Sequence, residues 1–450
     1  MNLDQKHNIY LIGIGGIGMS ALAFYFKVNG KHVAGYDRTR TELTGRLEDM
    51  GVKIHYEESL AHIDKQFMNP NTTLIIYTPA IPENHEELQF FKNTGFHVLK
   101  RSEVLGIITE NSFCIAVAGT HGKTTTTSIL GHLMNVCGVK LTAFLGGISE
   151  NYNSNLILKG TEVTVVEADE FDRSFLNLSP DFACITSMDA DHLDIYGDVS
   201  ELKKSFIEFS NKIKPNGKLF VKNGLPIDGI TYGIDDDSDY SVKNIKIENA
   251  MYVFDVVTPK TVLKNIQFNL PGRHNLSNAL VALAMAVEYG CPPEQLAKAL
   301  ASYKGVKRRF SYHLKTENLV LIDDYAHHPE EINAVYQAVK EMYPGKNILV
   351  VFQPHLFSRT KDFADAFATS LQQFDQILLL DIYPAREIPI KGITSEWLLE
   401  KIKNPNKKLI VKEDLTTEIQ KSNAAVVITM GAGDIGEEVK TIKHNLSFAS

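Results

Sequence analysis

Residues 116–127, AVAGTHGKTTTT, decide the fold of this 450-residue chain. An apolar run is expected to form a buried strand that enters a turn with Gly119 and Gly122, and a helix is expected to begin at Lys123. The backbone N–H groups of such a turn and of a helix N-terminus form a concave site for anions. The general P-loop pattern carries one more glycine, at the place that Val117 takes here, so this loop is the shorter G-x-x-G-K-T. A strand, this loop and a helix in that order predict a nucleotide site in an α/β domain.

Two side chains of the loop suit a nucleoside triphosphate. Lys123 would reach the β- and γ-phosphates, and the hydroxyl of Thr124 would ligate Mg²⁺. A glycine-rich turn by itself is often only a turn. The combination of strand, lysine, threonine and helix binds nucleotides much more often than not, so we interpret the loop as a nucleotide site.

A second glycine turn, GIGGIGMS at residues 13–20, follows another apolar run and opens another expected helix. Gly13, Gly15 and Gly18 match G-x-G-x-x-G, and Asp37 ends the next expected strand. In this pattern the glycines allow a tight turn and a close approach of the backbone to a diphosphate. Some matches are merely tight turns, and the pattern predicts a diphosphate without specifying NAD. Two phosphate sites in separate domains indicate two phosphorylated ligands in one reaction.

The composition fits a soluble protein of several domains. Hydrophobic residues make up 44% of the chain, and 46 Lys and Arg stand against 54 Asp and Glu, for a net charge of −8. This balance argues against a dedicated nucleic-acid binder. The start lacks the pattern of a signal peptide, and no apolar run approaches the ~20 residues that a transmembrane helix needs. Four well-separated cysteines indicate free thiols, so we expect a cytoplasmic protein that binds neither membrane nor nucleic acid.

Apolar strands alternate with expected helices along the chain, which is the pattern of α/β domains with largely parallel sheets. The pattern loosens around residues 100–110 and again around 304–310. We therefore predict three domains, at residues 1–110, 111–306 and 307–450. Residues 240–257 have antiparallel character, which indicates that the second sheet is mixed.

Acidic side chains follow two expected strands of the second domain. VTVVEADEFD and ACITSMDADHLD contribute Glu167, Asp169, Glu170, Asp172, Asp189, Asp191, His192 and Asp194. Ligands of open α/β sheets bind at the carboxyl ends of the strands, where oxygen and imidazole groups can hold Mg²⁺. Several of these acids are expected only to cap the following helix. Glu167 and His192 are the predicted metal ligands, because each comes soon after an apolar strand.

Further polar side chains that suit a ligand lie between residues 275 and 359, next to apolar runs. IDDYAHHPEE and FQPHLFSRTKDF contribute Asp324, His327, His328, His355, Ser358 and Arg359, which we interpret as one polar cleft. Asn275 and Asn278 stand at the head of an expected helix, where one of them would be an N-cap, and Arg308 and Arg309 suit bidentate phosphate contacts. No Ser-His-Asp or Cys-His arrangement emerges, so a covalent protein nucleophile is not favoured.

Taken together, the order GIGGIGMS, AGTHGKTTTT, EADEFD, DADHLD, GRHNLSNA, RRF, DDYAHHP, FQPHLFSRT and GAGD resembles that of the Mur ligases of bacterial peptidoglycan synthesis. The resemblance covers nearly the whole chain, and the combination is far more specific than any one piece. It implies an α/β protein of three domains: an N-terminal Rossmann-like domain for a UDP-sugar, a central P-loop ATPase domain with a mixed sheet, and a C-terminal Rossmann-like domain.

The resemblance also implies a reaction. ATP phosphorylates the lactyl carboxylate of UDP-N-acetylmuramate, and the amine of L-alanine attacks the acyl phosphate to give an amide, ADP and phosphate. Phosphoryl transfer depends mostly on positioning and charge neutralisation, so it needs a P-loop, a lysine and metal ligands for Mg²⁺. The implied catalytic residues are Lys123, Glu167 and His192.

Carried over residue by residue, the resemblance assigns four groups of side chains. The ATP phosphates would contact Gly119, Thr120, His121, Gly122, Lys123, Thr124 and Thr125, and the rest of the nucleotide Asn278, Arg309 and Asp324. Mg²⁺ would be held by Thr124, Glu167 and His192. The UDP-sugar would face Gly15, Gly16, Ile17, Gly18, Met19, Ser20, Asp37, Thr78, Ala80 and Ile81. The amino-acid pocket would be lined by His327, His328, His355 and Arg359, with Arg359 as the partner of the carboxylate.

One departure from the family matters. Family members that add later residues of the peptide carry a carbamylated lysine about fifteen positions after the metal histidine, and that spacing lands here on Ile207, with Lys204 nearby. No carbamylated lysine is therefore predicted.

Three other functions would each explain part of the pattern. A nicotinamide-dependent dehydrogenase would explain the first glycine turn and Asp37 but would leave G-x-x-G-K-T without a role. A P-loop switch without ligase chemistry would leave the first glycine turn and the third-domain cleft unexplained. A family member that joins a tripeptide to the same UDP-sugar shares most ATPase motifs, but GIGGIGMS and FQPHLFSRT favour the alanine-adding activity. The chain is expected to be a monomer or a homodimer.

Overall fold

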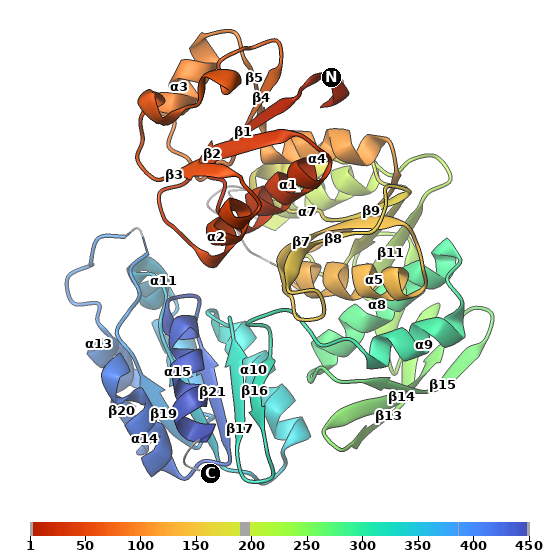
Figure 1. The fold of residues 1–450 in the computed structure, drawn as a ribbon. Helices are drawn as coiled ribbons and strands as arrows, with labels where there is room; N and C mark the ends of the chain where they lie inside the picture. Colours follow the sequence, from red (N-terminus) through yellow and green to blue (C-terminus); the bar gives the residue numbers. More distant parts are fainter. Residues whose placement is uncertain (1–2, 190–198, 386, 448–450) are drawn as a thin grey trace. The chain divides into compact units, whose positions relative to one another are not determined.

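The computed structural model describes residues 3–189, 199–385 and 387–447. The chain forms two compact units. One consists of Met1–Ile245, Phe254–Gln267 and Ser277–Tyr303, and the other of Lys246–Val253, Phe268–Leu276 and Lys304–Ser450. The first unit holds the first sheet and most of the second, and the second unit holds the third sheet (Figure 1).

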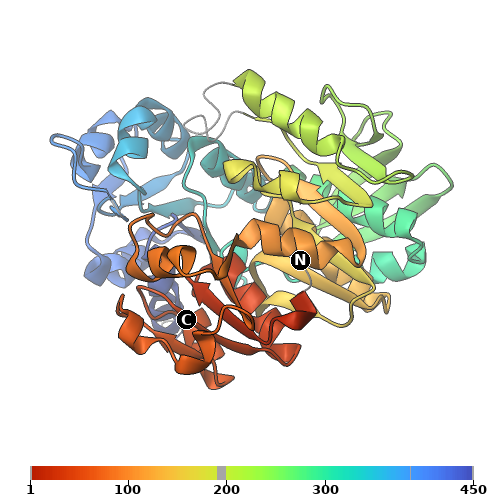
Figure 2. The same cartoon turned by 90° about the horizontal axis from the view of Figure 1, so that it is seen from above.

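The first sheet has five parallel strands in the order β3-β2-β1-β4-β5, coloured red and orange in Figures 1 and 2. The strands are β1 (Asn8–Ile12), β2 (His32–Tyr36), β3 (Lys53–His55), β4 (Thr73–Tyr77) and β5 (His97–Lys100). The helices are α1 (Ile17–Val28), α2 (Glu42–Asp49), α3 (Glu86–Asn93) and α4 (Arg101–Glu110), with short turns η1 (Leu3–Gln5), η2 (Leu60–His62) and η3 (Lys65–Phe67).

Alternate residues of β1 supply two separate cores. Ile9 and Leu11 belong to the cluster that includes α1, whereas Tyr10 and Ile12 belong to the cluster that includes α3. Because successive side chains of a strand point to opposite faces, the sheet is covered by helices on both sides. This is the predicted Rossmann-like arrangement. Helix α4, however, lies where the sequence pattern loosens.

The central sheet has ten strands in the order β15-β14-β13-β12-β11-β10-β6-β9-β7-β8. The strands are β6 (Phe113–Ala118), β7 (Leu141–Ser149), β8 (Ser154–Leu158), β9 (Val163–Glu167), β10 (Phe182–Ile185), β11 (Lys218–Lys222), β12 (Ile230–Ile234), β13 (Tyr240–Glu248), β14 (Met251–Val257) and β15 (Val262–Phe268). The helices are α5 (Lys123–Val136), η4 (Phe171–Asn177), α7 (Val199–Ser210), α8 (Arg273–Tyr289) and α9 (Pro293–Ala301).

Strand β6 lies between β9 and β10, and it is parallel to both. The carboxyl ends of the three strands therefore meet at one edge, which brings the loop after β6 beside the acidic segment after β9. Strands β7 and β8 pair antiparallel, which confirms that the sheet is mixed.

The third sheet has six strands in the order β16-β17-β21-β18-β19-β20, and only β16 at the edge is antiparallel to its neighbour. The strands are β16 (Ser311–Lys315), β17 (Val320–Asp324), β18 (Ile348–Phe352), β19 (Gln376–Leu379), β20 (Lys407–Leu409) and β21 (Val426–Met430). The helices are α10 (Pro329–Met342), α11 (Phe357–Asp362), α12 (Ala364–Leu371), α13 (Ser395–Lys401), α14 (Leu415–Ser422) and α15 (Ile435–Ser447), with the short turn η5 (Lys412–Asp414).

Both faces of this sheet are also buried. Ile322 and Val350 belong to one core cluster, and their neighbours Leu321 and Val351 belong to another. The predicted fold class, three α/β domains with a mixed central sheet, is thereby confirmed. Within the described ranges, no helix is long and apolar enough to span a bilayer, and the four cysteines are free thiols.

Candidate functional site

The loop between β6 and α5 has a backbone that only glycine fits at two places. Gly119 has a φ of +129°, and a Cβ there would lie 2.1 Å from the hydroxyl oxygen of Thr186. Gly122, the residue before α5, has a φ of +87°, and a Cβ there would lie 2.5 Å from Oδ1 of Asn278. The loop is therefore tightly enclosed, and the predicted nucleotide residue Asn278 lies directly beside it.

Hydroxyl groups after β10 hold the loop in place. Thr186 donates to the carbonyl oxygens of Ala118, at 3.1 Å, and His121, at 2.5 Å. Ser187 accepts a hydrogen bond from the backbone N–H of His121 at 2.9 Å. The hydroxyl of Thr120 donates to the carbonyl of Asp189 at 2.9 Å. Thr186 and Ser187 are not among the residues predicted from the sequence, where their only signal is two hydroxyl residues just after an apolar strand.

Lys123 begins α5 and is anchored from two sides. Its Nζ donates to the carbonyl oxygen of Gly119 at 2.8 Å and to both carboxylate oxygens of Glu170, at 2.7 and 2.9 Å. The side chain of Glu170 is 1% exposed, so the charge of the P-loop lysine is balanced by a buried carboxylate. The sequence placed Glu170 among several acids without distinguishing it from the others.

Glu167 ends β9 close to the start of α5. Its Oε1 accepts the N–H of Gly146 at 2.7 Å, and it shares a side-chain hydrogen bond with Thr124. Burial raises the pKa of Glu167, while the charge of Lys123 acts in the opposite direction. A Cβ on Gly146 would lie 2.3 Å from the carboxylate of Glu167, so this approach requires glycine.

The oxygen atoms of Thr124 and Glu167 form a donor pair suited to Mg²⁺, which commonly takes one or two protein ligands together with substrate phosphates and water. The third predicted ligand, His192, lies in residues 190–198, outside the described residues. Within the part of the chain that is described, no group of three or more His, Cys, Asp or Glu side chains is arranged to hold a metal. A metal held mainly by nucleotide phosphates fits this donor set.

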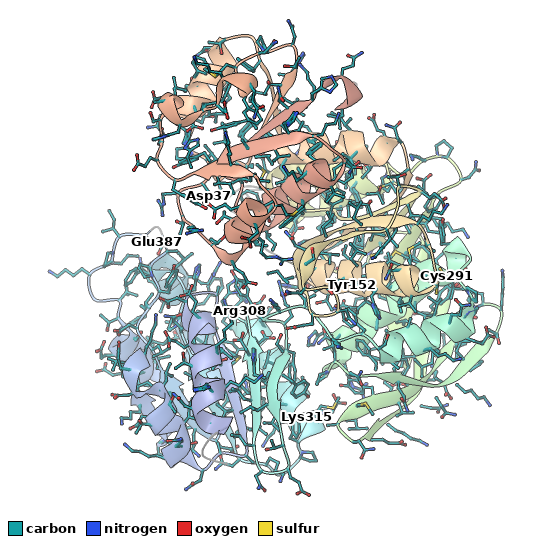
Figure 3. The ribbon with its side chains drawn as sticks, in the orientation of Figure 1. Asp37, Tyr152, Cys291, Arg308, Lys315 and Glu387 are labelled. Atoms are coloured by element: carbon teal, nitrogen blue, oxygen red, sulfur yellow. The ribbon has the colours of Figure 1, made fainter. Side chains whose placement is uncertain are left out.

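The first glycine turn lies between β1 and α1. Asp37, labelled in Figure 3, follows β2 and accepts the N–H of Gly15 at 2.7 Å, so its carboxylate fixes the turn itself. A Cβ on Gly13 would lie 2.8 Å from the methyl group of Thr78 and 3.3 Å from Ile81. The predicted loop after β4 therefore packs against the first glycine of the motif.

A cavity of about 350 Å³ within the first unit extends from this turn to Glu167 at the end of β9. It is lined by Gly16, Ile17, Gly18, Met19, Ala21, Leu22, Thr78, Arg101, Leu105, Phe144, Leu145, Gly146, Glu167 and Asp169. Residues of the predicted UDP-sugar site and the predicted metal ligand Glu167 thus line the same space. Arg101, Gly146 and Asp169 are lining residues that the sequence analysis did not assign to a site.

Five of the ten predicted UDP-sugar residues are not among those that line the cavity: Gly15, Ser20, Asp37, Ala80 and Ile81. The buried hydroxyl of Ser20 donates to the carbonyl of Ile17 at 3.1 Å, and it accepts from the side-chain amide of Asn155 at 2.9 Å. Asn155 also donates to the carbonyl of Ile17 at 2.6 Å, so this pair ties α1 to β8. Ala80 is exposed.

In the second unit, Arg308 and Arg309 differ in their surroundings. Arg308, labelled in Figure 3, donates to the carbonyl oxygens of Gly431 and Gly433, and its Nε lies 3.4 Å from Oδ2 of Asp323. Its guanidinium group therefore binds the backbone of the GAGD turn at residues 431–434. Both guanidinium groups also lie near the ring of Tyr325, with Cζ of Arg308 at 5.1 Å and Cζ of Arg309 at 5.9 Å from the ring centre.

Asp324, at the end of β17, accepts the backbone N–H groups of Phe310 and Ala326, each at 2.7 Å. Burial raises the pKa of Asp324 to about 7, against the lowering effect of the Arg309 charge. Asp324 and Arg309, both predicted to contact the nucleotide, are thus neighbours in this unit.

Three of the four residues predicted for the amino-acid pocket come together in the second unit. The ring centres of His327 and His355 are 6.1 Å apart, and Nδ1 of His355 lies 3.4 Å from Nη1 of Arg359. Burial lowers the pKa of His327. Burial and the charges of His327 and Arg359 lower the pKa of His355 to about 4. At neutral pH the group offers neutral imidazoles beside one guanidinium, a setting suited to a carboxylate and an amine.

His328, the fourth predicted residue, precedes α10. Its backbone N–H donates to Glu331 at 3.2 Å, and its ring centre lies 4.7 Å from that of Phe363. Glu387, labelled in Figure 3, is not among the predicted residues. It accepts hydrogen bonds from the backbone N–H and the hydroxyl of Ser358, the residue before Arg359.

Three family models match the chain in succession. They are described as "Mur ligase family, catalytic domain", at residues 8–112, "Mur ligase middle domain", at residues 117–286, and "Mur ligase, glutamate ligase domain", at residues 308–433.

Full-length relatives give the same result. The UDP-N-acetylmuramate–L-alanine ligases of Christiangramia forsetii and Flavobacterium psychrophilum are 61% and 62% identical over 446 residues, covering 99% of each chain. A crystal structure of UDP-N-acetylmuramate–alanine ligase from Thermotoga maritima, 27% identical, matches with a TM-score of 0.84 over 98% of this chain and 100% of that one. A murein peptide ligase from Psychrobacter arcticus, 22% identical, shares the fold with a TM-score of 0.67 over 98% of both chains. The chain therefore belongs to the Mur ligase family.

Proposed function

We propose that this chain uses ATP to join the amino group of L-alanine to the lactyl carboxylate of UDP-N-acetylmuramate, through an acyl phosphate, in the making of peptidoglycan precursors. The observation that carries the proposal is the identity of 61–62% with two relatives of this name over nearly the whole of each chain. The reaction would take place in the cytoplasm, where ATP is available. The protein would act as a monomer or as a homodimer.

The first unit would activate the carboxylate. The glycine turn before α1 would take the diphosphate at the N-terminus of that helix. The lactyl carboxylate would lie in the cavity toward Glu167, near the loop that would hold the phosphates of ATP. Lys123 would neutralise charge that develops during phosphoryl transfer, which is where this class of reaction gains most of its rate.

Mg²⁺ would be held by Thr124 and Glu167, with His192 as the further ligand predicted from the sequence. When bound, the ion would supply charge neutralisation between the phosphates and the acceptor carboxylate. Asn278, Arg309 and Asp324 would contact the rest of the nucleotide.

The second unit would bind the amino-acid substrate. Arg359 would pair with the carboxylate of L-alanine, because a guanidinium forms two parallel hydrogen bonds with that group. His327 and His355, neutral at physiological pH, would present ring nitrogens that can accept a hydrogen bond from the amino group of L-alanine. The free amine would then attack the acyl phosphate.

The test is phosphate release from Mg-ATP, with UDP-N-acetylmuramate and L-alanine present together and each omitted in turn. Release that requires both substrates supports the proposal. Release only when a tripeptide replaces L-alanine would identify a peptide-recycling ligase instead. Release with neither substrate would identify a nucleotide switch, and both of these results would overturn the proposal.

A further inference from the structure

Arg101 begins α4 and is the one cation among the described residues that line the cavity. The other charged lining residues are the carboxylates of Glu167 and Asp169. A UDP-sugar would bring a diphosphate and a carboxylate into this space. Like charges repel strongly where little water screens them, so the cavity needs a positive group to accept such a ligand.

The third glycine of G-x-G-x-x-G leaves room for this arginine. A Cβ on Gly18 would lie 2.8 Å from Nη1 and 3.2 Å from Cζ of Arg101. Gly18 lies in the first turn of α1 and has an ordinary helical backbone, so its backbone conformation does not demand glycine. The close approach means that the guanidinium lies directly over the N-terminal turn of α1.

The ion pair between Arg101 and Asp169 is long and weak, so a ligand can replace Asp169 as the partner of Arg101. Nη2 of Arg101 lies 3.9 Å from Oδ2 of Asp169, beyond hydrogen-bond distance, and the two side chains are 26% and 39% exposed. Such an ion pair contributes little to stability. A phosphate could replace it with short, charge-assisted hydrogen bonds.

We propose that Arg101 binds the diphosphate of the UDP-sugar against the N-terminus of α1, an inference that rests on the proposed function. The helix supplies N–H groups and the positive end of its dipole from one side, and the guanidinium supplies a full charge from the other. Asp169 holds Arg101 near this position before the ligand arrives and is displaced from it by the diphosphate.

Calorimetric titration of the full chain with UDP tests the proposal without requiring catalysis. Arg101→Ala should weaken UDP binding by about 10- to 100-fold, the effect of losing charge-assisted hydrogen bonds. The UDP affinity of Arg101→Lys should lie between those of wild type and Arg101→Ala, because lysine keeps the positive charge but lacks the planar guanidinium group.

Lys100→Ala is the matched control. Lys100 is the preceding residue, pairs with Asp172 at 2.6 Å, and does not line the cavity. It should change UDP affinity by no more than about twofold. Equal affinity in Arg101→Ala and wild type, or equal losses in Arg101→Ala and Lys100→Ala, would overturn the proposal. A thermal melt of each variant shows whether it is folded. If Arg101→Ala is unfolded, the comparison of UDP affinity is made with Arg101→Lys instead.

Two further ligands locate the contact. UDP-N-acetylglucosamine lacks the lactyl carboxylate, so both it and UDP-N-acetylmuramate should lose affinity to the same extent in Arg101→Ala. A loss confined to UDP-N-acetylmuramate would place Arg101 at the carboxylate and overturn the assignment. Failure of the proposed function is a separate result, because wild-type protein would then bind UDP but release no substrate-dependent phosphate.

Discussion

The ammonium group of Lys123 lies 2.7 Å from Oε2 of Glu170, a carboxylate that is 1% exposed. This ion pair joins the P-loop to the segment that starts at Glu167, the last residue of β9, and both Glu167 and Asp169 line the cavity. The P-loop lysine thus has a buried carboxylate as its partner. A triphosphate that reaches Lys123 must share it with Glu170.

Lys123→Ala should abolish ATP-dependent turnover and leave the fold intact. The loop itself is held by Thr186 and Ser187, which do not depend on the lysine. Phosphate release in the presence of both substrates measures turnover, and circular dichroism checks the fold. Activity near that of wild type would remove Lys123 from the phosphate site.

Glu170→Gln should make the protein more dependent on nucleotide for stability. Removing one partner of a buried ion pair leaves the other charge uncompensated. Bound triphosphate would restore the balance, and a ligand that binds only the native state raises the melting temperature. The expected result is a lower Tm without nucleotide and a larger rise on adding Mg-ATP than in wild type.

Glu162→Gln is the control for that measurement. Glu162 also pairs with a lysine, Lys140, at 3.2 Å, but both side chains are more than half exposed. This variant should shift neither Tm nor the response to Mg-ATP. An equal loss of Tm in Glu170→Gln with and without nucleotide would show that the pairing is unrelated to phosphate binding.

Much of the site could be predicted from short stretches of sequence. The loop at Gly119–Lys123 and the turn at Gly13–Gly18 are each contained in one strand-turn-helix unit, where local pattern and backbone requirement coincide. The strand ends at Glu167 and Asp324 were also identified, because apolar runs mark buried strands.

The remainder depends on which distant strands become neighbours. Thr186 contacts the P-loop because β10 pairs with β6 in the register Cys184 to Val117, and no local pattern specifies that pairing. Arg101 lies in a region where the periodicity loosens, and only the packing of α4 brings it over Gly18. The carboxylate of Asp37, a residue predicted to face the UDP-sugar, accepts the N–H of Gly15, and this contact is set by tertiary packing.

Glu87 predicts a pH dependence of stability in the first domain. Its side chain is fully buried and accepts the hydroxyl of Tyr10 at 2.7 Å, and burial raises its pKa to about 7. The folded state therefore binds this proton more tightly than the unfolded state, whose glutamate pKa is about 4.3. The stabilising effect of the proton is complete below pH ~4.3 and is lost as pH rises through about 7.

Glu87→Gln removes this titration, so its Tm relative to wild type should rise between pH 5 and pH 8. His55 and His85 nearby have pKa values lowered by burial, and their contribution has the opposite sign, since it is lost as pH falls. Because both histidines are present in the variant and in wild type, the difference in Tm between the two proteins at each pH cancels much of the histidine contribution. Glu86→Gln, at the exposed neighbour, should show no such trend, and a flat difference for Glu87→Gln would contradict the assignment.

Arg359→Ala should mainly raise the apparent KM for L-alanine. The guanidinium lies 3.4 Å from His355 and is the cation of the predicted pocket, so its loss removes the partner of the substrate carboxylate. Steady-state kinetics with each substrate varied in turn measures the effect. Lys361→Ala, an exposed cation on the same helix, should leave all constants unchanged. A rise confined to ATP would move Arg359 to the nucleotide site.

Gly18→Ala should weaken UDP binding only while Arg101 is present. An alanine suits the helical backbone at this position, and in a helix it is more stable than glycine by about 1 kcal/mol. Its Cβ would nevertheless lie 2.8 Å from Nη1 of Arg101 and displace the guanidinium. In a double-mutant cycle, Gly18→Ala should therefore reduce UDP affinity in the wild-type background and have little effect in Arg101→Ala.

Gly45→Ala is the control for this cycle, because Gly45 lies in α2 and a Cβ there would meet nothing within 4 Å. It should raise Tm slightly and leave UDP affinity unchanged in both backgrounds. If Gly18→Ala weakened UDP binding equally with and without Arg101, the glycine would serve the approach of the phosphate to the helix rather than that of the arginine. Non-additive effects would instead show that the third glycine of the motif makes room for a side chain 83 positions away, since 101 − 18 = 83.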